Sequence, residues 1–391
     1  MEPKNKYRVL YVAPRYHTNQ VPIVKGWLSN GHKVCFVSHY ARRGEDYKCL
    51  NPVVLGYSKI FHLIFNLYKI FCNILKRKRG SNLYEFQLKL GFPPIGRASK
   101  IVEEFQPNFV ILRERALYNI PFYKVCKKKN IPCILYNQSP LWDRPGRDSG
   151  LLRKSLLRFF PKRRITPVLG NPKSEAEKTE NAFYLPFVME PYVSWEEKKH
   201  FQKNQVRIIS VGRYEPRKQM FLLLEVVKDL LAEYSLHLTF AGEVISDEQE
   251  IYYNCLLQKV KEYNLEKDIV LLRNLSREQM FAIYRESDLF VLPSTKERAS
   301  VSQLEAMSCS MPVICSDTNG SACYVKSGIN GYLFRDLDKD DLYEKLVCMI
   351  KNRKKLEEMG KNSYQLVLDE YQFKNYFDKL MEVIYGRAEW H

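Results

Sequence analysis

Two carboxylates, Glu297 and Glu305, lie eight positions apart just after a short apolar run. The run LFVL at 289–292 is continuously apolar, which is typical of a strand covered on both faces of a parallel sheet. Pro293 ends this strand, and the polar residues that follow predict a loop at its carboxyl end and then a helix capped by Ser300. In open α/β sheets ligands bind at that edge, so Glu297 lies where a ligand is expected.

A second strand end carries positive charge. The β-branched run at 206–211 is followed by Gly212, by a turn with Arg213 and Lys218, and by an amphipathic helix. Gly212 permits close backbone approach, and two cations near a helix N-terminus favour a diphosphate. Together with the two carboxylates, these cations predict a nucleotide-sugar site. The alternative for each pair is a set of solvated loop charges.

The stretch from about 206 to about 381 resembles the donor domain of the family 4 glycosyltransferases, which are retaining enzymes of the GT-B fold. The resemblance is carried by four segments, in the family's order and spacing: VGRYEPRKQ, LPSTKERASVSQLEAM, MPVICSDTNG and YVKSGINGYLF. The fold that it implies is α/β, with two Rossmann-like doubly wound domains that face a cleft.

The resemblance also implies roles for individual residues. The donor-binding set is Gly212, Arg213, Lys218, Ser300, Val301 and Glu305. Within this set Arg213 and Lys218 would hold the diphosphate, Glu305 the ribose, and the backbone N–H groups near Ser300 and Val301 the phosphate and sugar. Glu297 would hold the transferred sugar and act in catalysis with the two cations. The chain departs from the family beside the sugar, where Ala299 and Ser300 replace an aromatic residue and Gly.

The first half of the chain also alternates strand and helix patterns, which predicts a second doubly wound unit. Strands are expected in YRVLYVAP, KVCFVS, NFVILRE and PCILYNQ. The predicted domains are an acceptor-binding domain at 1–185, a linker at 186–205, a donor domain at 206–370 and a C-terminal helix at 371–391 that crosses back to the first domain. The linker is placed by the two prolines and lost periodicity of YLPFVMEPY.

Acceptor contacts in the first domain are predicted at His17 and Asn19, after the first strand, and at Asn137 and Gln138. Many relatives have a His where this chain reads LYNQSP, and an amide side chain cannot replace it as a base. No general base is assigned, although His17 stays a candidate. Retention, which the resemblance implies, needs none, since the leaving diphosphate can accept the acceptor's proton.

Positive charge is concentrated in the first half. Residues 1–190 carry 34 Lys and Arg against 13 Asp and Glu, whereas 191–391 carry 28 against 31. Two basic amphipathic segments, 58–79 and 150–164, contribute to this excess. One polar stripe of the first segment contains Lys59, His62, Asn66, Lys69, Asn73 and Lys76. This pattern predicts a helix at the interface of an anionic membrane, with a core helix as the alternative. Nucleic acid is not expected, because no recognition motif accompanies the charge.

Other features place the chain in the cytoplasm, on the inner face of the plasma membrane. The N-terminus has no signal-peptide pattern, and no apolar run is long enough to span a bilayer. The ten cysteines form no Cys-x-x-Cys pair, so neither a zinc site nor a disulfide framework is expected. Asp338-Lys339-Asp340 matches an Asp-x-Asp metal signature, but its place before a helix favours dipole-stabilising acids.

The sequence therefore predicts a retaining, metal-independent glycosyltransferase with no cofactor besides its nucleotide-sugar substrate. It would move a hexose-type sugar to a lipid-linked or other glycan acceptor at an anionic membrane, in polysaccharide biosynthesis. Two alternatives remain open at this point. One is a non-catalytic basic binding protein on a GT-B scaffold, and the other is a GT-B nucleotide-sugar epimerase.

Overall fold

The computed structural model describes residues 6–41, 47–74, 79–113, 116–138, 159–169 and 181–386. The chain divides into two compact units with separate hydrophobic cores. The first unit comprises Met1–Pro167, Glu177–Val188 and Tyr376–His391, and the second comprises Val168–Ala176 and Met189–Asn375. Among the described helices, none has both the length and the apolar composition needed to cross a bilayer.

Parallel strands form the sheet of the first unit, in the order β3-β2-β1-β4-β5-β6-β7. They are β1 (Arg8–Ala13), β2 (Lys33–Ser38), β3 (Val53–Val54), β4 (Phe109–Arg113), β5 (Cys133–Tyr136), β6 (Arg164–Thr166) and β7 (Ala182–Tyr184). The strands predicted from the four apolar segments are thus confirmed as β1, β2, β4 and β5. The strand order reverses between β1 and β4, so the carboxyl ends of these two strands flank a topological switch point.

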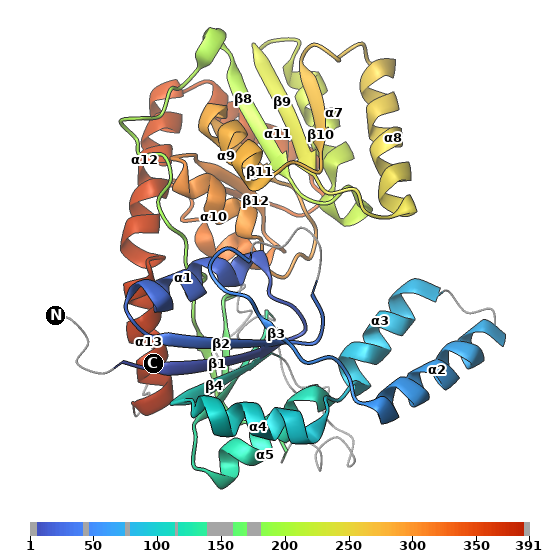
Figure 1. Ribbon diagram of the computed structural model, residues 1–391. Helices are drawn as coiled ribbons and strands as arrows, with labels where there is room; N and C mark the ends of the chain where they lie inside the picture. Colours follow the sequence, from blue (N-terminus) through green and yellow to red (C-terminus); the bar gives the residue numbers. More distant parts are fainter. Residues whose placement is uncertain are drawn as a thin grey trace. The chain divides into compact units, whose positions relative to one another are not determined.

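Helices cover both faces of this first sheet (Figure 1). They are α1 (Val21–Ser29), α2 (Lys59–Ile74), α3 (Arg79–Leu90), α4 (Ile95–Phe105) and α5 (Ile120–Lys128). Figure 1 shows α1 on one side of the sheet and α4 and α5 on the other, while α2 and α3 extend away from the sheet as a pair. The later part of α13 (Phe373–Tyr385) also belongs to this unit, and its Tyr376 hydroxyl lies 3.5 Å from the Tyr11 hydroxyl of β1.

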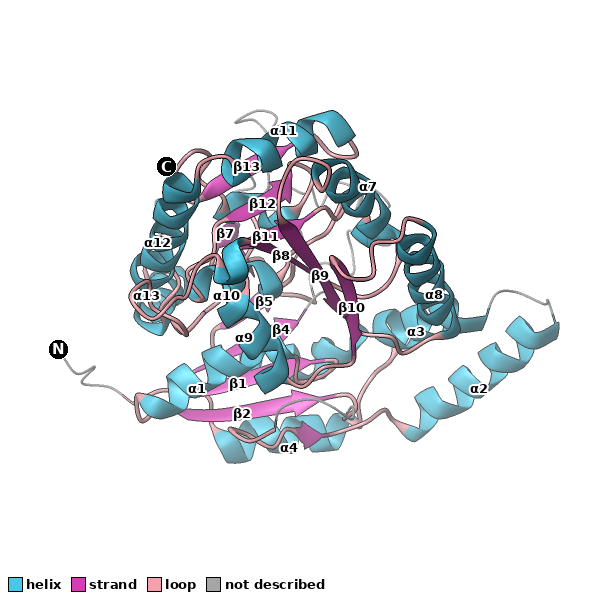
Figure 2. Cartoon of the chain, turned by 90° about the horizontal axis from the view of Figure 1, so that it is seen from above, coloured by secondary structure: helices cyan, strands magenta, loops and turns pink. Residues whose placement is uncertain are grey.

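The sheet of the second unit repeats the same topology, in the order β10-β9-β8-β11-β12-β13 (Figure 2). Its parallel strands are β8 (Val206–Val211), β9 (Leu236–Gly242), β10 (Ile269–Arg273), β11 (Leu289–Leu292), β12 (Val313–Ser316) and β13 (Gly331–Phe334). The reversal falls between β8 and β11. All four side chains of β11 are buried, as its continuous apolar run predicted.

The helices of the second unit are α7 (Met220–Leu230), α8 (Asp247–Glu262), α9 (Arg277–Glu286), α10 (Val301–Ser308), α11 (Lys339–Ile350) and α12 (Arg353–Glu370). Local capping fixes several of their starts. Ser276 and Gln279 form a capping box at α9, and the Asp338 carboxylate accepts the N–H of Asp341 at α11. Asp338 is therefore an N-cap, consistent with the helix-dipole interpretation of this acidic segment.

The segment predicted as an interdomain linker is mostly part of the second unit. Met189 and the residues up to 205 group with that unit, and the backbone N–H groups of Tyr192 and Val193 donate to the Ser308 carbonyl. The buried Lys198 ammonium donates to the Tyr284 carbonyl of α9 at 2.7 Å. The interdomain linker over 186–205 stays a prediction. The boundary between the two units falls within this range, between Val188 and Met189, and the residues after it pack on the second unit by backbone hydrogen bonds.

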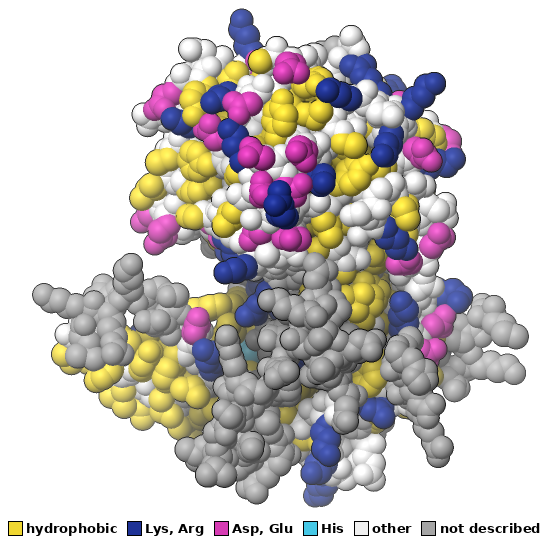
Figure 3. All heavy atoms as spheres, turned by 180° about the vertical axis from the view of Figure 1, so that it is seen from behind, with side chains coloured by type: hydrophobic (Ala, Val, Ile, Leu, Met, Phe, Trp, Pro, Cys, Tyr) yellow, Lys and Arg dark blue, Asp and Glu magenta, His cyan; other side chains and the backbone are white. Residues whose placement is uncertain are grey.

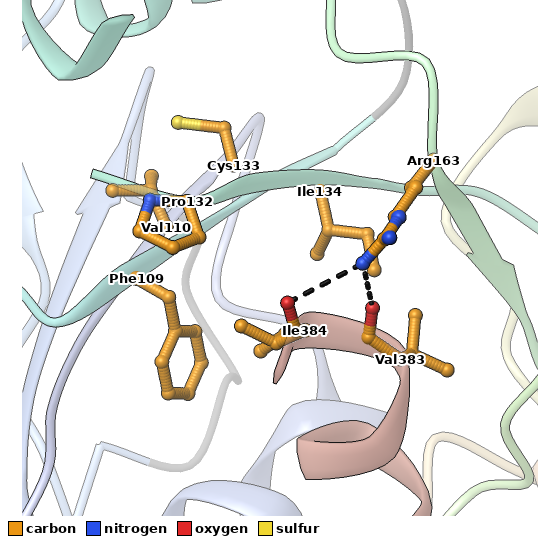
Figure 4. Close-up of a pocket in the computed structure, with 8 residues that line it drawn as sticks. All are labelled: Phe109, Val110, Pro132, Cys133, Ile134, Arg163, Val383 and Ile384. Atoms are coloured by element: carbon orange, nitrogen blue, oxygen red, sulfur yellow. Dashed lines mark hydrogen bonds between the residues drawn. The ribbon is translucent and has the colours of Figure 1, made fainter. Parts of the chain in front are cut away.

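A cavity of about 220 Å³ lies in the first unit, at the amino ends of β4 and β5 (Figure 4). Apolar side chains line most of it, and the Arg163 guanidinium borders it while donating to the carbonyls of Val383 and Ile384 in α13. This position is opposite to the carboxyl edge at which α/β sheets bind ligands. The cavity therefore coincides with none of the sites that the sequence predicts.

Candidate functional site

The loops after β8 and β11 meet at the switch point of the second sheet. The residues after β8 turn through a short 3-10 helix, Pro216–Lys218, before α7 begins. The backbone N–H of Thr295, after β11, donates to the Arg217 carbonyl at 2.9 Å and joins the two loops. Strand order thus brings together residues that lie about 80 positions apart in the sequence.

An ion pair between Lys218 and Glu297 forms the centre of this site. The Lys218 Nζ lies 2.7 Å and 2.6 Å from the two carboxylate oxygens of Glu297. Only 7% of Lys218 is exposed, so this pair is shielded from solvent. Burial lowers the pKa of the Lys218 ammonium, while Glu297 opposes that shift. Burial alone would raise the pKa of Glu297, but Lys218 and Arg217 hold it below its usual value, so the carboxylate stays ionised.

Gly212 has a structural role that was not predicted. A Cβ at this position would lie 2.7 Å from Cε of Lys218. The missing side chain therefore makes room for the Lys218 side chain as it passes toward Glu297. The expected approach of the Gly212 backbone to a phosphate stays a prediction.

The second cation beside Glu297 is Arg217, which was not among the predicted site residues. Its guanidinium donates to Glu215 at 2.6 Å and lies 3.6 Å from Glu297. Arg213, which was expected next to Lys218, has a half-exposed side chain that lies 3.5 Å from Glu215. All three cations follow β8, so the basic turn GRYEPRK was the signal that could have identified Arg217. The positive charge of Arg213, Arg217 and Lys218 is thus partly neutralised by Glu215 and Glu297 before any ligand binds.

Backbone contacts fix the position of Glu297. The N–H of Gly320 donates to the Glu297 carbonyl at 2.7 Å. A Cβ on Gly320 would lie 1.5 Å from the Arg298 carbonyl oxygen, so only glycine allows this approach. Lys296 has a φ of 47°, and this left-handed residue helps to turn the loop so that Glu297 faces Lys218.

Glu305 lies in α10 and has other partners, both from α9. The Tyr284 hydroxyl donates to one carboxylate oxygen at 3.3 Å, and an Arg277 guanidinium nitrogen lies 3.8 Å from the other. Burial raises the pKa of Glu305, and Arg277 and Tyr284 oppose that rise. Arg277 and Tyr284 could not be identified from the sequence, because their approach to Glu305 depends on how α9 packs beside α10.

The residues between the two glutamates behave only partly as expected. Ser300 stands at the N-cap position of α10, but its hydroxyl pairs with the Ser302 hydroxyl at 2.7 Å and does not cap the helix. Its backbone N–H donates to the Ser321 hydroxyl at 2.6 Å, so a ligand would have to displace Ser321 to use it. Val301 is the first residue of α10, and its N–H has no acceptor within the helix.

The four acceptor candidates lie in the first unit, after β1 and β5. The His17 ring nitrogen accepts the N–H of Asn19, and the Asn19 side chain is buried. The Asn137 backbone N–H donates to the Ile165 carbonyl. The Gln138 amide oxygen accepts from Arg113, whose guanidinium also lies over the Tyr136 ring. Arg113, at the end of β4, is a cation at the switch point of the first sheet that was not among the predicted site residues.

Known proteins resemble this chain in sequence over the second unit. Residues 193–366 match the family model described as Glycosyl transferases group 1. The matched residues all lie in the second unit.

One relative of the second unit is a UDP-Gal:alpha-D-GlcNAc-diphosphoundecaprenol alpha-1,3-galactosyltransferase of Escherichia coli, 28% identical over 46% of this chain and 46% of that protein. Another is a poly(ribitol-phosphate) alpha-N-acetylglucosaminyltransferase of Staphylococcus aureus, 23% identical over 47% of this chain and 36% of that protein. The group 1 match thus spans less than half of these curated relatives.

Solved structures resemble the whole chain and not only the residues that match the family model. A glycosyltransferase from Rickettsia africae has a TM-score of 0.71 at 14% identity and covers 97% of this chain and 98% of its own. HepE of Anabaena in complex with UDP has a TM-score of 0.69 at 13% identity, with 97% and 99% covered. The two parallel sheets with their helices are those of the GT-B glycosyltransferases, which confirms the predicted fold class.

The two partners of Glu305 lead to a prediction for this domain. We expect Glu305→Ala to weaken binding of a nucleoside diphosphate about tenfold or more, because charge-assisted hydrogen bonds to the ribose would be lost. Tyr284→Phe, which removes only the hydroxyl contact to Glu305, should weaken it less. Calorimetry with whichever of UDP, GDP or ADP gives the largest thermal shift measures both effects. Unchanged affinity in Glu305→Ala would remove the ribose assignment.

Proposed function

We propose that this protein is a retaining glycosyltransferase that moves a hexose-type sugar from a nucleotide-sugar donor to a membrane-held, lipid-linked glycan. The observation that carries the proposal is the buried Lys218–Glu297 pair at the switch point of a group 1 glycosyl transferase domain. A cation and a carboxylate in direct contact, beside the open edge of the sheet, suit the two halves of a sugar diphosphate. Lys218 would bind the phosphate oxygens, and Glu297 the sugar hydroxyls.

The chemistry needs only the groups described above. The bond between the anomeric carbon and the leaving diphosphate oxygen breaks, and its electron pair stays on the diphosphate. Lys218 and Arg217 stabilise that developing charge, since a preorganised cation in a shielded site is worth more than in water. The acceptor oxygen bonds to the anomeric carbon from the same face, and its proton passes to the departing diphosphate. Glu297 orients the sugar and stabilises its oxocarbenium-like state.

This route needs neither a separate protein base nor a metal ion. Lys218, Arg217 and Arg213 supply the positive charge that a divalent cation supplies in other transferases. The relay of the proton to the diphosphate also fits the first unit, in which Gln138 is an amide held by Arg113 and cannot act as a base. The site is thus proposed to work without a metal and without a cofactor.

The proposed acceptor and location rest on charge and on relatives. The Escherichia coli relative is named for a diphosphoundecaprenol substrate, which is a lipid-linked sugar. The first 190 residues of the present chain have an excess of 21 positive charges, which suits an acceptor with a diphosphate at an anionic membrane. We place the protein in the cytoplasm, on the inner face of the plasma membrane, in polysaccharide biosynthesis.

The stereochemical test is the sharpest for this function. The protein is incubated with an α-linked nucleotide sugar, chosen by thermal shift against UDP, GDP and ADP sugars, and with a polyprenyl-diphosphate saccharide as acceptor. We expect proton NMR of freshly formed product to show an α-anomeric signal, and turnover to persist in EDTA. A β-anomeric product would overturn the retaining mechanism. Epimerisation of the sugar without acceptor would support the epimerase alternative. No turnover with any donor would support the binding-protein alternative.

A further inference from the structure

Helix α2 presents three distinct faces. Its large apolar side chains that are 43% to 73% exposed are Ile60, Leu63, Ile64, Leu67, Ile70, Phe71 and Ile74. Their spacing of three and four residues places them on one face of the helix. Scattered single hydrophobics are normal on a surface, but a continuous apolar face marks an interaction site. Figure 3 shows a patch of hydrophobic side chains at the lower left of the view, on the side where this helix lies.

A different face of α2 attaches it to the protein. Phe61, Phe65 and Cys72 are buried, and the rings of Phe61 and Phe65 lie 6.2 Å and 6.1 Å from the Phe86 ring of α3. The ring of Tyr68 stacks on Phe86 at 3.9 Å. The packing of α2 on α3 therefore does not use the exposed apolar face. The alternative of a core helix, which the sequence left open, is wrong for α2.

The third face is polar and basic, and it borders the apolar face. It holds Lys59, His62, Asn66, Lys69 and Asn73, all exposed, as the predicted stripe required. Lys76, the last member of the predicted stripe, lies outside the described residues. The helix contains no Asp or Glu. An apolar face next to a basic polar face is the pattern of a helix that lies in a membrane interface.

The base of the α2–α3 hairpin is anchored at the carboxyl edge of the first sheet. The Tyr57 hydroxyl, just before α2, lies 3.3 Å from a ring nitrogen of His39, which follows β2. The Tyr118 hydroxyl, after β4, donates to the Gly56 carbonyl at 2.8 Å. This is the edge at which the acceptor candidates His17 and Gln138 also lie, because all strands of the sheet are parallel.

We propose that α2 lies in the headgroup layer of an anionic membrane and inserts its seven exposed apolar side chains, so that the first unit docks with its acceptor edge near the lipid. This rests on the proposed function in one respect, which is that the acceptor is held at a membrane. Charge favours lipid over a second copy of the chain as the occupant. Each copy carries a net charge of +18, so two copies repel, whereas an anionic surface attracts the basic face.

The test compares two variants with a matched control. Each variant replaces three apolar side chains of α2 by Gln, which is a good helix former and should keep the helix intact. The two variants are Leu63→Gln/Leu67→Gln/Phe71→Gln and Ile60→Gln/Ile70→Gln/Ile74→Gln. Ile245→Gln/Ile251→Gln/Ile329→Gln replaces three isoleucines of the second unit that are 57%, 63% and 51% exposed. Sedimentation uses vesicles of phosphatidylcholine and phosphatidylglycerol in a two-to-one ratio, without donor or acceptor, and vesicles of phosphatidylcholine alone.

We expect each α2 variant to lose about tenfold or more in vesicle partitioning, because the buried apolar area falls, while the control partitions like wild type. Lys59→Gln/Lys69→Gln should reduce the preference for anionic vesicles. Raising the salt from about 0.1 M to about 1 M should weaken wild-type binding only in part, since apolar insertion is not screened. Folding is checked by circular dichroism.

Three outcomes would overturn the proposal. They are wild-type protein that ignores both kinds of vesicle, α2 variants that bind like wild type, and a dimer that the α2 variants convert to monomer with vesicle binding unchanged. The last outcome would assign the face to a second copy. Sugar transfer to a soluble acceptor, measured without lipid, tests the transferase function independently of membrane binding. The α2 variants should turn over that acceptor normally, and vesicle binding without any sugar transfer would count against the function alone.

Discussion

We expect Lys218→Ala to lower turnover by about a hundredfold, because the variant loses the shielded cation that stabilises the departing diphosphate. The position of Lys218 gives it this weight. It is buried, it contacts Glu297 through both carboxylate oxygens, and Gly212 leaves space for its side chain. Arg213→Ala should cost much less, since the Arg213 side chain is half exposed and lies next to Glu215. Steady-state release of nucleotide at saturating donor measures both variants.

The controls separate loss of chemistry from loss of fold. Lys228→Ala removes another lysine, which lies in α7 and pairs with Glu225, and it should leave turnover unchanged. Removing Lys218 alone leaves Glu297, whose side chain is 12% exposed, with Arg217 at 3.6 Å as its remaining cation, and breaking a buried pair can cost about 3 to 5 kcal/mol of stability. The double variant Lys218→Met/Glu297→Gln avoids a poorly paired charge and should be more stable than Lys218→Ala. A folded Lys218→Ala protein with wild-type turnover would exclude the assignment.

Glu297→Gln should abolish sugar transfer and strengthen the binding of a free nucleoside diphosphate. The resemblance implies separate roles for Glu297, which would bind the sugar, and for Arg213 and Lys218, which would bind the diphosphate. On that basis the loss of the Glu297 carboxylate would leave nucleotide binding nearly unaffected. The contact between Glu297 and Lys218 instead couples the two roles, because a diphosphate must compete with Glu297 for the same ammonium. Charge-assisted bonds contribute about 1.5 to 3 kcal/mol each, so releasing Lys218 should tighten binding by about tenfold or more.

Calorimetry with the free nucleotide and with the intact donor tests this coupling. In wild type we expect the sugar hydroxyls of the donor to hydrogen-bond to the Glu297 carboxylate once the diphosphate binds Lys218. The donor should therefore bind more tightly than the free nucleotide. In Glu297→Gln that difference should shrink or reverse. A Gln variant that binds the nucleotide more weakly than wild type would contradict the competition. Normal transfer by a folded Gln variant would remove Glu297 from catalysis.

The nature and order of the elements could be predicted from the sequence, since these depend on local patterns. Continuous apolar runs such as LFVL mark buried parallel strands, and the segments around Gly212 and Glu297 occur in the order typical of a group 1 domain. Periodicity also predicted an amphipathic helix in 58–79, where the structure has α2 over Lys59–Ile74 with the described residues of the polar stripe exposed. The fold class, and the likeness of the second unit to group 1 glycosyl transferases, could thus be predicted before any coordinates.

Side-chain partners were decided only by the tertiary structure, because strand order and helix packing are not local properties. The placement of β8 beside β11 makes Lys218 the partner of Glu297, and the packing of α9 brings Tyr284 to Glu305. Periodicity gave α2 an apolar face, but it could not say whether that face is buried. Only the contacts with Phe86 show that another side of α2 packs inward and that the wide apolar face meets solvent.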